Sequence, residues 1–156
     1  MRTQLLSGAG KRVLCSMLVC LLWALAVPAG ARAAAAFGDT TCAVQSVTIG
    51  ATTTWQIKGT TSVTGLIPGG NGVTVTVEFQ KMAKGAPGWS KMLKVKQEID
   101  GLGGKATIDT GFNDFTAAPA SGDQYRIHVT GANRTAPLPK NNPLNPVDST
   151  PITPIP

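Results

Sequence analysis

Histidine and cysteine, on which much enzyme and metal chemistry depends, are scarce in this sequence of 156 residues. The one histidine is His128, and the three cysteines are Cys15, Cys20 and Cys42. A catalytic triad needs a histidine beside a nucleophile and an orienting group, and the sequence has no Gly-x-Ser-x-Gly motif. A zinc site needs three or four ligands at suitable spacing. We therefore expect a protein that is not an enzyme and has no metal or cofactor.

Charged residues are also few, at 14% of the chain, and the basic ones are concentrated at its start. Arg2, Lys11 and Arg12 precede an apolar run over residues 13–27, and small residues follow around Ala33. This layout is typical of a signal peptide. The run is shorter than the roughly 20 apolar residues that span a bilayer. We expect residues 1–33 to form a cleavable signal helix, and the mature protein to be secreted to the periplasm, the cell surface or the extracellular space, with no stable membrane span.

Removal of this leader changes both the charge and the cysteine count. Residues 34–156 contain ten basic and eight acidic side chains, so their net charge is +2 and nucleic acid is not an expected partner. Only Cys42 remains, which excludes a disulfide within the chain. Two interpretations of Cys42 stay open: a small buried residue at the start of a strand, or a thiol that pairs with a second chain.

Period-two alternation is the clearest structural pattern. In residues 73–80, valines and Phe79 alternate with Thr, Glu and Gln, which predicts a half-buried strand. Shorter strands are predicted at 44–49, 55–57, 93–95, 106–108 and 125–129. Clusters of Gly, Pro, Asn and Asp separate them, so we expect an all-β antiparallel β-sandwich over residues 37–134. Seven prolines follow in residues 135–156, which predicts a disordered or semi-rigid tail without strands.

Two segments resemble a known family. Residues 77–91 resemble the hairpin between the third and fourth strands of fibronectin type III and related immunoglobulin-like domains. Residues 119–133 are similar to the penultimate strand of those domains, where a tyrosine ties down the preceding corner. The resemblance implies that Tyr125 has this role and that Trp55 is a core tryptophan. Fold alone does not imply function.

Several acidic side chains are nominal functional groups. Glu78 belongs to the polar side of its strand and is expected to be solvated, while Asp123 lies in a turn where it can cap backbone donors. His128 is expected to face solvent. Residues 109–114 gather oxygen-bearing side chains around a glycine, which suits calcium, although turn capping explains them as well.

The leading hypothesis is a secreted, non-enzymatic module with a structural, adhesive or protein-interaction role, whose partner is an unknown protein or polysaccharide surface. The alternative is a module that binds carbohydrate or an anionic polymer. It would use Trp89 as a stacking platform, together with Lys84, Lys91 and Lys94. Lysines on a hairpin also serve solubility and protect a strand edge, so this surface has a simpler explanation.

Overall fold

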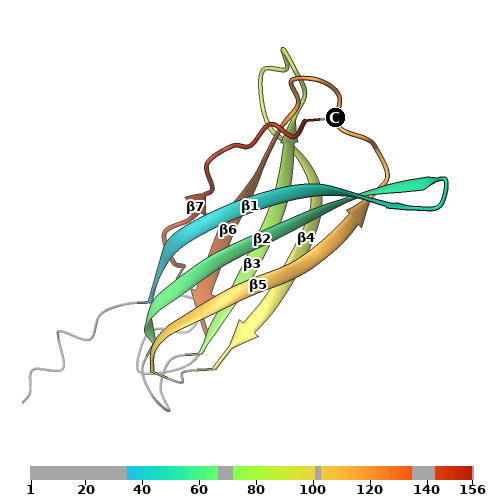
Figure 1. Cartoon of the computed structure of the whole chain (residues 1–156). Coiled ribbons are helices and arrows are strands. Elements are labelled where there is room, and N and C mark those ends of the chain that lie inside the picture. Colours follow the sequence, from blue (N-terminus) through green and yellow to red (C-terminus); the bar gives the residue numbers. More distant parts are fainter. Residues whose placement is uncertain (1–34, 67–71, 101–102, 135–142, 156) are drawn as a thin grey trace, which may run out of the picture. The chain divides into compact units, whose positions relative to one another are not determined.

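The computed structural model describes residues 35–66, 72–100, 103–134 and 143–155. Within these residues the protein consists of two antiparallel sheets and contains no helix (Figure 1). One sheet has the strand order β1-β2-β5 and is built from β1 (Ala36–Ile49), β2 (Thr52–Leu66) and β5 (Gly104–Phe115). The other has the order β4-β3-β6-β7 and is built from β3 (Val73–Met82), β4 (Ser90–Ile99), β6 (Gln124–Asn133) and β7 (Val147–Asp148). The prediction of an all-β antiparallel protein is confirmed.

The core lies between the two sheets. Val73, Val75, Val77 and Phe79 of β3 are at most 1% exposed, which confirms the alternation predicted for this strand. They belong to one cluster with buried residues of β2, β5 and β6, among them Ile57, Val63, Ile108, Ile127 and Val129. Each sheet therefore contributes one apolar face, as a sandwich requires.

The sheets approach each other closely at Gly59 of β2. A Cβ atom at this position would lie 3.0 Å from Cγ2 of Ile127 and 3.2 Å from Cγ1 of Val77, both on the opposite sheet. Side chains of the four-stranded sheet thus occupy the space that any larger residue would need. The φ angle of Gly59 is not in the left-handed region, so the backbone conformation does not require glycine here. The close packing of the two sheets does.

The C-terminal segment differs from the expected disordered tail. Val147–Asp148 forms β7 against β6, and the amide and carbonyl of Tyr125 exchange two 2.9 Å hydrogen bonds with Ile152. Leu144 is 6% exposed, and its amide donates to the carbonyl of Gly131. The expectation is wrong for residues 143–155, because the non-proline residues between the prolines still donate and accept hydrogen bonds along the edge of β6. Residues 135–142 lie outside the described part of the chain.

The segment that leads from β5 into β6 is fixed by an aspartate. Asp123 is 2% exposed; its Oδ2 accepts a 2.8 Å hydrogen bond from the amide of Ala120, and its Oδ1 accepts one from the amide of Lys84. The Nζ of Lys81 lies 2.6 Å from Oδ2 and, together with these amides, holds the pKa of Asp123 below its ordinary value. The predicted capping role of Asp123 is confirmed.

Tyr125, expected from the resemblance to tie this corner, is fully buried in β6, and its ring lies 5.7 Å from that of Phe115. Its hydroxyl donates no hydrogen bond to a backbone carbonyl among the described residues. The residue packs into the interior, and Asp123 makes the hydrogen bonds of the corner.

The predicted signal peptide, residues 1–33, lies outside the described residues. Across the ranges that are described, no helix is long and apolar enough to cross a membrane.

Candidate functional site

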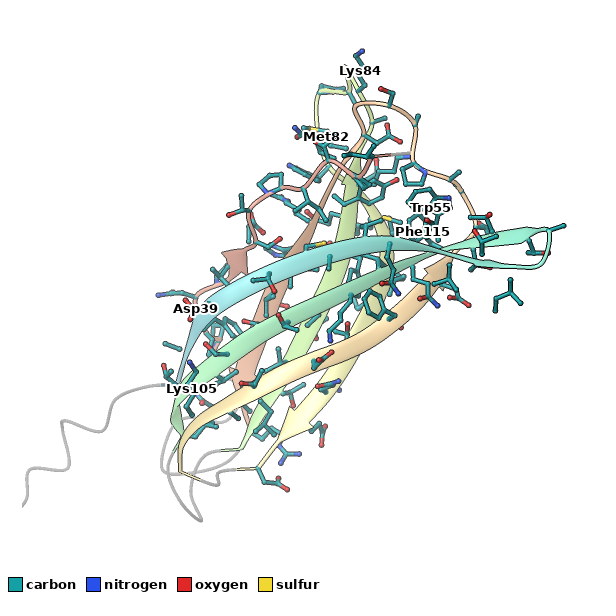
Figure 2. The ribbon with its side chains drawn as sticks, in the orientation of Figure 1. Asp39, Trp55, Met82, Lys84, Lys105 and Phe115 are labelled. Atoms are coloured by element: carbon teal, nitrogen blue, oxygen red, sulfur yellow. The ribbon has the colours of Figure 1, made fainter. Side chains whose placement is uncertain are left out.

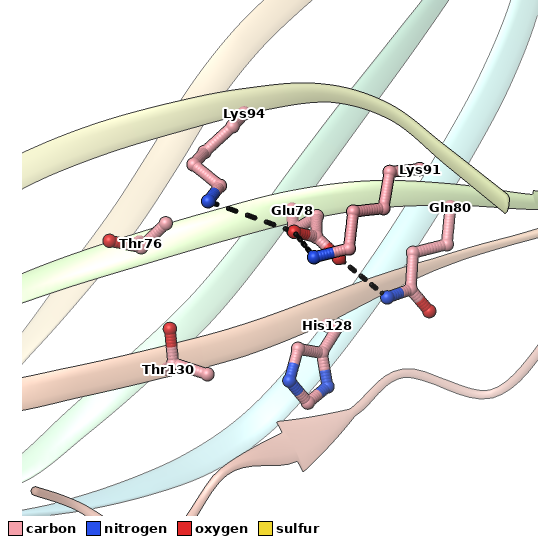
Figure 3. Close-up of a pocket in the computed structure, with 7 residues that line it drawn as sticks. All are labelled: Thr76, Glu78, Gln80, Lys91, Lys94, His128 and Thr130. Carbon is pink, nitrogen blue, oxygen red and sulfur yellow. Dashed lines mark hydrogen bonds and ion pairs between the residues drawn. The ribbon is translucent and has the colours of Figure 1, made fainter. Parts of the chain in front are cut away.

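Two of the four residues proposed for ligand binding approach the same carboxylate. Lys91 and Lys94 of β4 both approach the carboxylate of Glu78 on β3, with Nζ atoms 3.1 and 3.8 Å from its Oε2 (Figure 3). Trp89 precedes Lys91 by two residues, and the guanidinium of Arg126 covers one face of its ring at 4.3 Å from the ring centre. Arg126 also donates a 2.9 Å hydrogen bond to Gln80 of β3. Lys84 is exposed in the β3–β4 turn, beside Gly122.

Lys94 belongs to a row of side chains that crosses all four strands of the larger sheet. Lys94, Glu78, His128 and Asp148 are successive cross-strand neighbours on β4, β3, β6 and β7. Around this row is a hollow of about 340 Å³ on the outer face of the sheet, which we call the polar hollow (Figure 3). Its lining consists of Thr76, Glu78, Gln80, Lys91, Lys94, His128 and Thr130.

Glu78 is buried, although its place on the polar side of the strand suggested a solvated carboxylate. It is only 6% exposed, since β3 lies between β4 and β6 and long side chains from both neighbours cover it. Gln80 donates a 2.8 Å hydrogen bond to its Oε1. This bond, followed by the charges of Lys91 and Lys94, lowers the pKa of Glu78 against the opposing effect of burial. The carboxylate is therefore ionised and fully partnered, which does not suit a proton donor in catalysis.

His128 points outward, as predicted, but it is not free in solvent. Its Nδ1 lies 2.7 Å from Oδ1 of Asp148, whose Oδ2 accepts from Arg126 at 2.8 Å. Sequence reasoning missed this pair because Asp148 belongs to the segment expected to be disordered. Among the described residues no hydroxyl hydrogen-bonds to His128, so the pair lacks the nucleophile of a catalytic triad.

The segment considered for calcium, residues 109–114, is part of β5 and contains a left-handed residue at Gly111, with φ near 65°. Asp109 accepts a 2.9 Å hydrogen bond from the amide of Gly111, and the Nζ of Lys58 lies 2.6 Å from its other oxygen. The described residues contain no cluster of three or more histidine, cysteine or acidic side chains that suits a metal ion. Local capping and an ion pair account for this carboxylate.

Trp55, expected in the core, is only half-buried. It faces Phe115 across the β2–β5 pairing, near the point where the β1–β2 hairpin extends past the rest of the sheet (Figures 1 and 2). Both aromatic residues line an open hollow that we call the Trp55 groove, together with Thr53, Thr54, Asp114, Thr116 and Ala118. The expectation that Trp55 is a core residue is wrong, because the interior does not extend beneath this end of β2.

Cys42 lies in the middle of β1, not at its start, and packs against the core. Burial raises the pKa of its thiol to about 12. Since the thiolate is the reactive form, the position suits a packing residue better than a thiol that pairs with a second chain.

No known protein-family model matches this sequence, and no curated protein is similar to it.

Proposed function

We propose that the chain is a secreted, non-enzymatic β-sandwich module of the fibronectin type III or immunoglobulin-like kind, with a structural or adhesive role outside the cell. The support for this architecture is the arrangement of seven strands in two packed antiparallel sheets. β3 and β4 pair as the resemblance implies for the third and fourth strands, and β6 is next to last in chain order.

The free edge of β1 is the observation that supports a structural or adhesive role. This strand pairs with β2 along one side, and its other side makes no backbone hydrogen bond among the described residues. Residues 40–49 contain no charge, no proline and no glycine. Natural proteins usually protect such an edge, because its unpaired amides and carbonyls can pair with another chain.

The other long edges of the molecule are protected. β4 has Lys91, Lys94 and Lys96 along its length, and β5 has Asp109 and a left-handed glycine beside it. β7 is two residues long. The contrast singles out β1 as the edge through which a second protein chain adds.

A second copy of the chain fits this edge best. Two β1 strands related by a two-fold axis run antiparallel, and their pairing joins the two three-stranded sheets into a single six-stranded sheet. Because residues 40–49 are uncharged, no like charges face each other in a register that pairs this part of β1 with itself. We infer that copies associate edge to edge, which gives the module a structural role.

Sedimentation of the purified protein over a range of concentrations tests this association. We expect a reversible dimer, and we expect lysines at two exposed positions of β1, Ala43→Lys with Gln45→Lys, to abolish it. Ser90→Lys, at an exposed position of β4, is the matched control and leaves the dimer intact. A wild-type protein that stays monomeric, or a dimer that survives both β1 lysines, contradicts the proposal.

The structure gives less support to the alternative, a carbohydrate or anionic-polymer site at Trp89, Lys84, Lys91 and Lys94. The charges of Lys91 and Lys94 are directed to Glu78, and Arg126 occupies one face of the Trp89 ring. Heparin binding that disappears in Trp89→Ala would favour this alternative over the proposed role.

A further inference from the structure

The part of β1 that can pair with a second chain is bounded at both ends. The regular pairing of β1 with β2 is interrupted between Phe37 and Thr40, and it ends at Ile49, where the turn of the β1–β2 hairpin follows (Figure 1). Before the interruption, Phe37 lines a hollow together with residues 145–147 of the C-terminal segment, so this end of β1 is covered. Residues 40–49 therefore make up the free edge.

Two-fold symmetry restricts how two such edges can pair. Side chains alternate between the two faces of a strand, so one residue of β1 must lie opposite the same residue of the second copy, at the axis. An axis at Val44 pairs residues 40–48 of both copies, and an axis at Gln45 pairs residues 41–49. Any other axis uses a shorter part of the free edge. These two positions therefore give the longest ladders of backbone hydrogen bonds.

The hydrogen bonds of Gln45 distinguish between these two positions. Gln45 is exposed on the outer face of its sheet, and its Nε2 donates a 2.9 Å hydrogen bond to Oε1 of Gln56, the direct neighbour on β2. Nε2 of Gln56 in turn donates a 2.9 Å hydrogen bond to Oδ1 of Asp114, the direct neighbour on β5. Among the described residues, the Oε1 and the second amide hydrogen of Gln45 have no partner. A row of side-chain hydrogen bonds thus crosses the sheet and stops at the free edge.

We propose that Gln45 sets the register of the two β1 strands by facing Gln45 of the second copy at the two-fold axis. This inference rests on the proposed association through β1. Each amide donates its second hydrogen to the Oε1 of the other, so the row continues from Asp114 of one copy to Asp114 of the other. Glutamine ladders of this kind also form between stacked strands. With the axis at Val44, Gln45 would lie opposite Ala43, and its amide would have no side-chain partner there.

The other side chains on the outer face of β1 fit this register. Ala43 lies opposite Val47 of the second copy, so a small residue meets a β-branched one. Thr41 lies opposite Ile49, which is 78% exposed in the single chain and is partly covered by the pairing. Pairs of this kind contribute to the stability of a sheet. Asp39, the charged residue nearest to the free edge, lies outside the paired stretch.

Disulfide cross-linking of cysteine variants tests the register. In the proposed pairing, residue 43 lies opposite residue 47 of the second copy, whereas the two copies of residue 43 are offset by four positions, roughly 14 Å along the strand. A disulfide requires Cα atoms within about 7 Å. We expect an oxidised mixture of Ala43→Cys and Val47→Cys to give a cross-linked dimer and each variant alone to give none. Gln45→Cys should cross-link with itself. The wild type, which retains Cys42, is the control and should give no cross-link.

A pair of charged variants tests the contribution of the amide. In Gln45→Glu, two carboxylates face each other at the axis, whereas in the matched control Ala43→Glu they are four positions apart. We expect sedimentation to show a dimer dissociation constant at least about tenfold higher for Gln45→Glu than for Ala43→Glu, because like charges directly opposite each other destabilise paired strands. Both positions are exposed, so both variants should keep the melting temperature of the wild type.

The outcomes separate this inference from the association on which it rests. If Gln45→Cys cross-links with Ala43→Cys or with Val47→Cys rather than with itself, the axis lies at a neighbouring residue. That result overturns the role of Gln45 and leaves the association through β1 standing. Equal dissociation constants for Gln45→Glu and Ala43→Glu overturn it as well. A wild-type protein that sediments as a monomer at every concentration overturns both the register and the association.

Discussion

Replacing Gly59 with alanine tests how tightly the two sheets are packed. The new methyl group would lie 3.0 and 3.1 Å from two carbons of Ile127 and 3.2 Å from Val77, distances at which the neighbours must move. Overpacking of this kind costs about 1–3 kcal/mol, and the reduced freedom of the unfolded chain returns about 0.4–1 kcal/mol. We expect a net loss of about 1–2 kcal/mol in the free energy of unfolding, measured by urea denaturation.

Two further variants make this measurement specific. Gly88→Ala is the control, because a Cβ atom there meets nothing within 4 Å and its φ is not left-handed. Only the reduced freedom of the unfolded chain acts there, so this variant should be more stable than the wild type by about 0.4–1 kcal/mol. Ile127→Val alone should cost about 0.5–1.5 kcal/mol. Combined with Gly59→Ala it should cost less than the sum of the two, since it removes the carbon 3.1 Å from the added methyl. A Gly59→Ala protein as stable as the wild type refutes the close approach of the sheets.

Three other perturbations follow from the structure. The pKa of Glu78 is lower in the folded protein than its ordinary value of 4.5, so its ion pairs stabilise the fold at neutral pH. This contribution is lost as the pH falls below about 4.5 through the folded-state value. Urea denaturation at a series of pH values should therefore show a smaller loss of stability in acid for Glu78→Gln than for the wild type. Deletion of residues 143–156 exposes the edge of β6 and removes buried Leu144. The melting temperature should therefore fall, and light scattering should detect aggregation. An unchanged melting temperature would mean that this segment does not contribute to the stability of the fold. Cys42 should react with a thiol reagent at mildly alkaline pH only after denaturant is added, because burial raises its pKa to about 12; rapid labelling of the native protein would contradict its packing.

The central strands could be predicted from the sequence because their side chains alternate strictly. Residues 73–80 place every second side chain in the interior, and β6 repeats the pattern at Tyr125, Ile127 and Val129. Such alternation reports directly on which face of a strand is buried. It indicated two layers with a shared core, although it does not determine which strands are neighbours.

The C-terminal segment could not be predicted in the same way. Prolines in residues 143–155 indicated a chain without regular pairing, and local sequence does not reveal that a distant edge, that of β6, accepts the remaining amides. The pairing also brings Asp148 to His128 and Arg126. Contacts between residues twenty positions apart leave no periodic pattern in the sequence.

The candidate sites show a similar limit. The sequence placed Lys91 and Lys94 among the lysines of one predicted hairpin, but the burial of Glu78 depends on the position of β3 between β4 and β6 in the four-stranded sheet. Trp55 has the parity of a core residue, and only the length of the β1–β2 hairpin beyond the opposite sheet leaves it accessible. A pattern of side chains defines a face, whereas the extent of the facing layer decides what that face contacts.

The position of β7 has a consequence for the order in which the protein is made. Residues 143–155 leave the ribosome after β6, so the newly synthesised chain has six strands and an unpaired edge until this stretch follows. The main-chain groups that later bond to Ser149 and Ile152 are open to other molecules during that interval. Formation of the sandwich is thus completed from its C-terminal side. Until then the open edge of β6 is the place where a chaperone for nascent chains would bind.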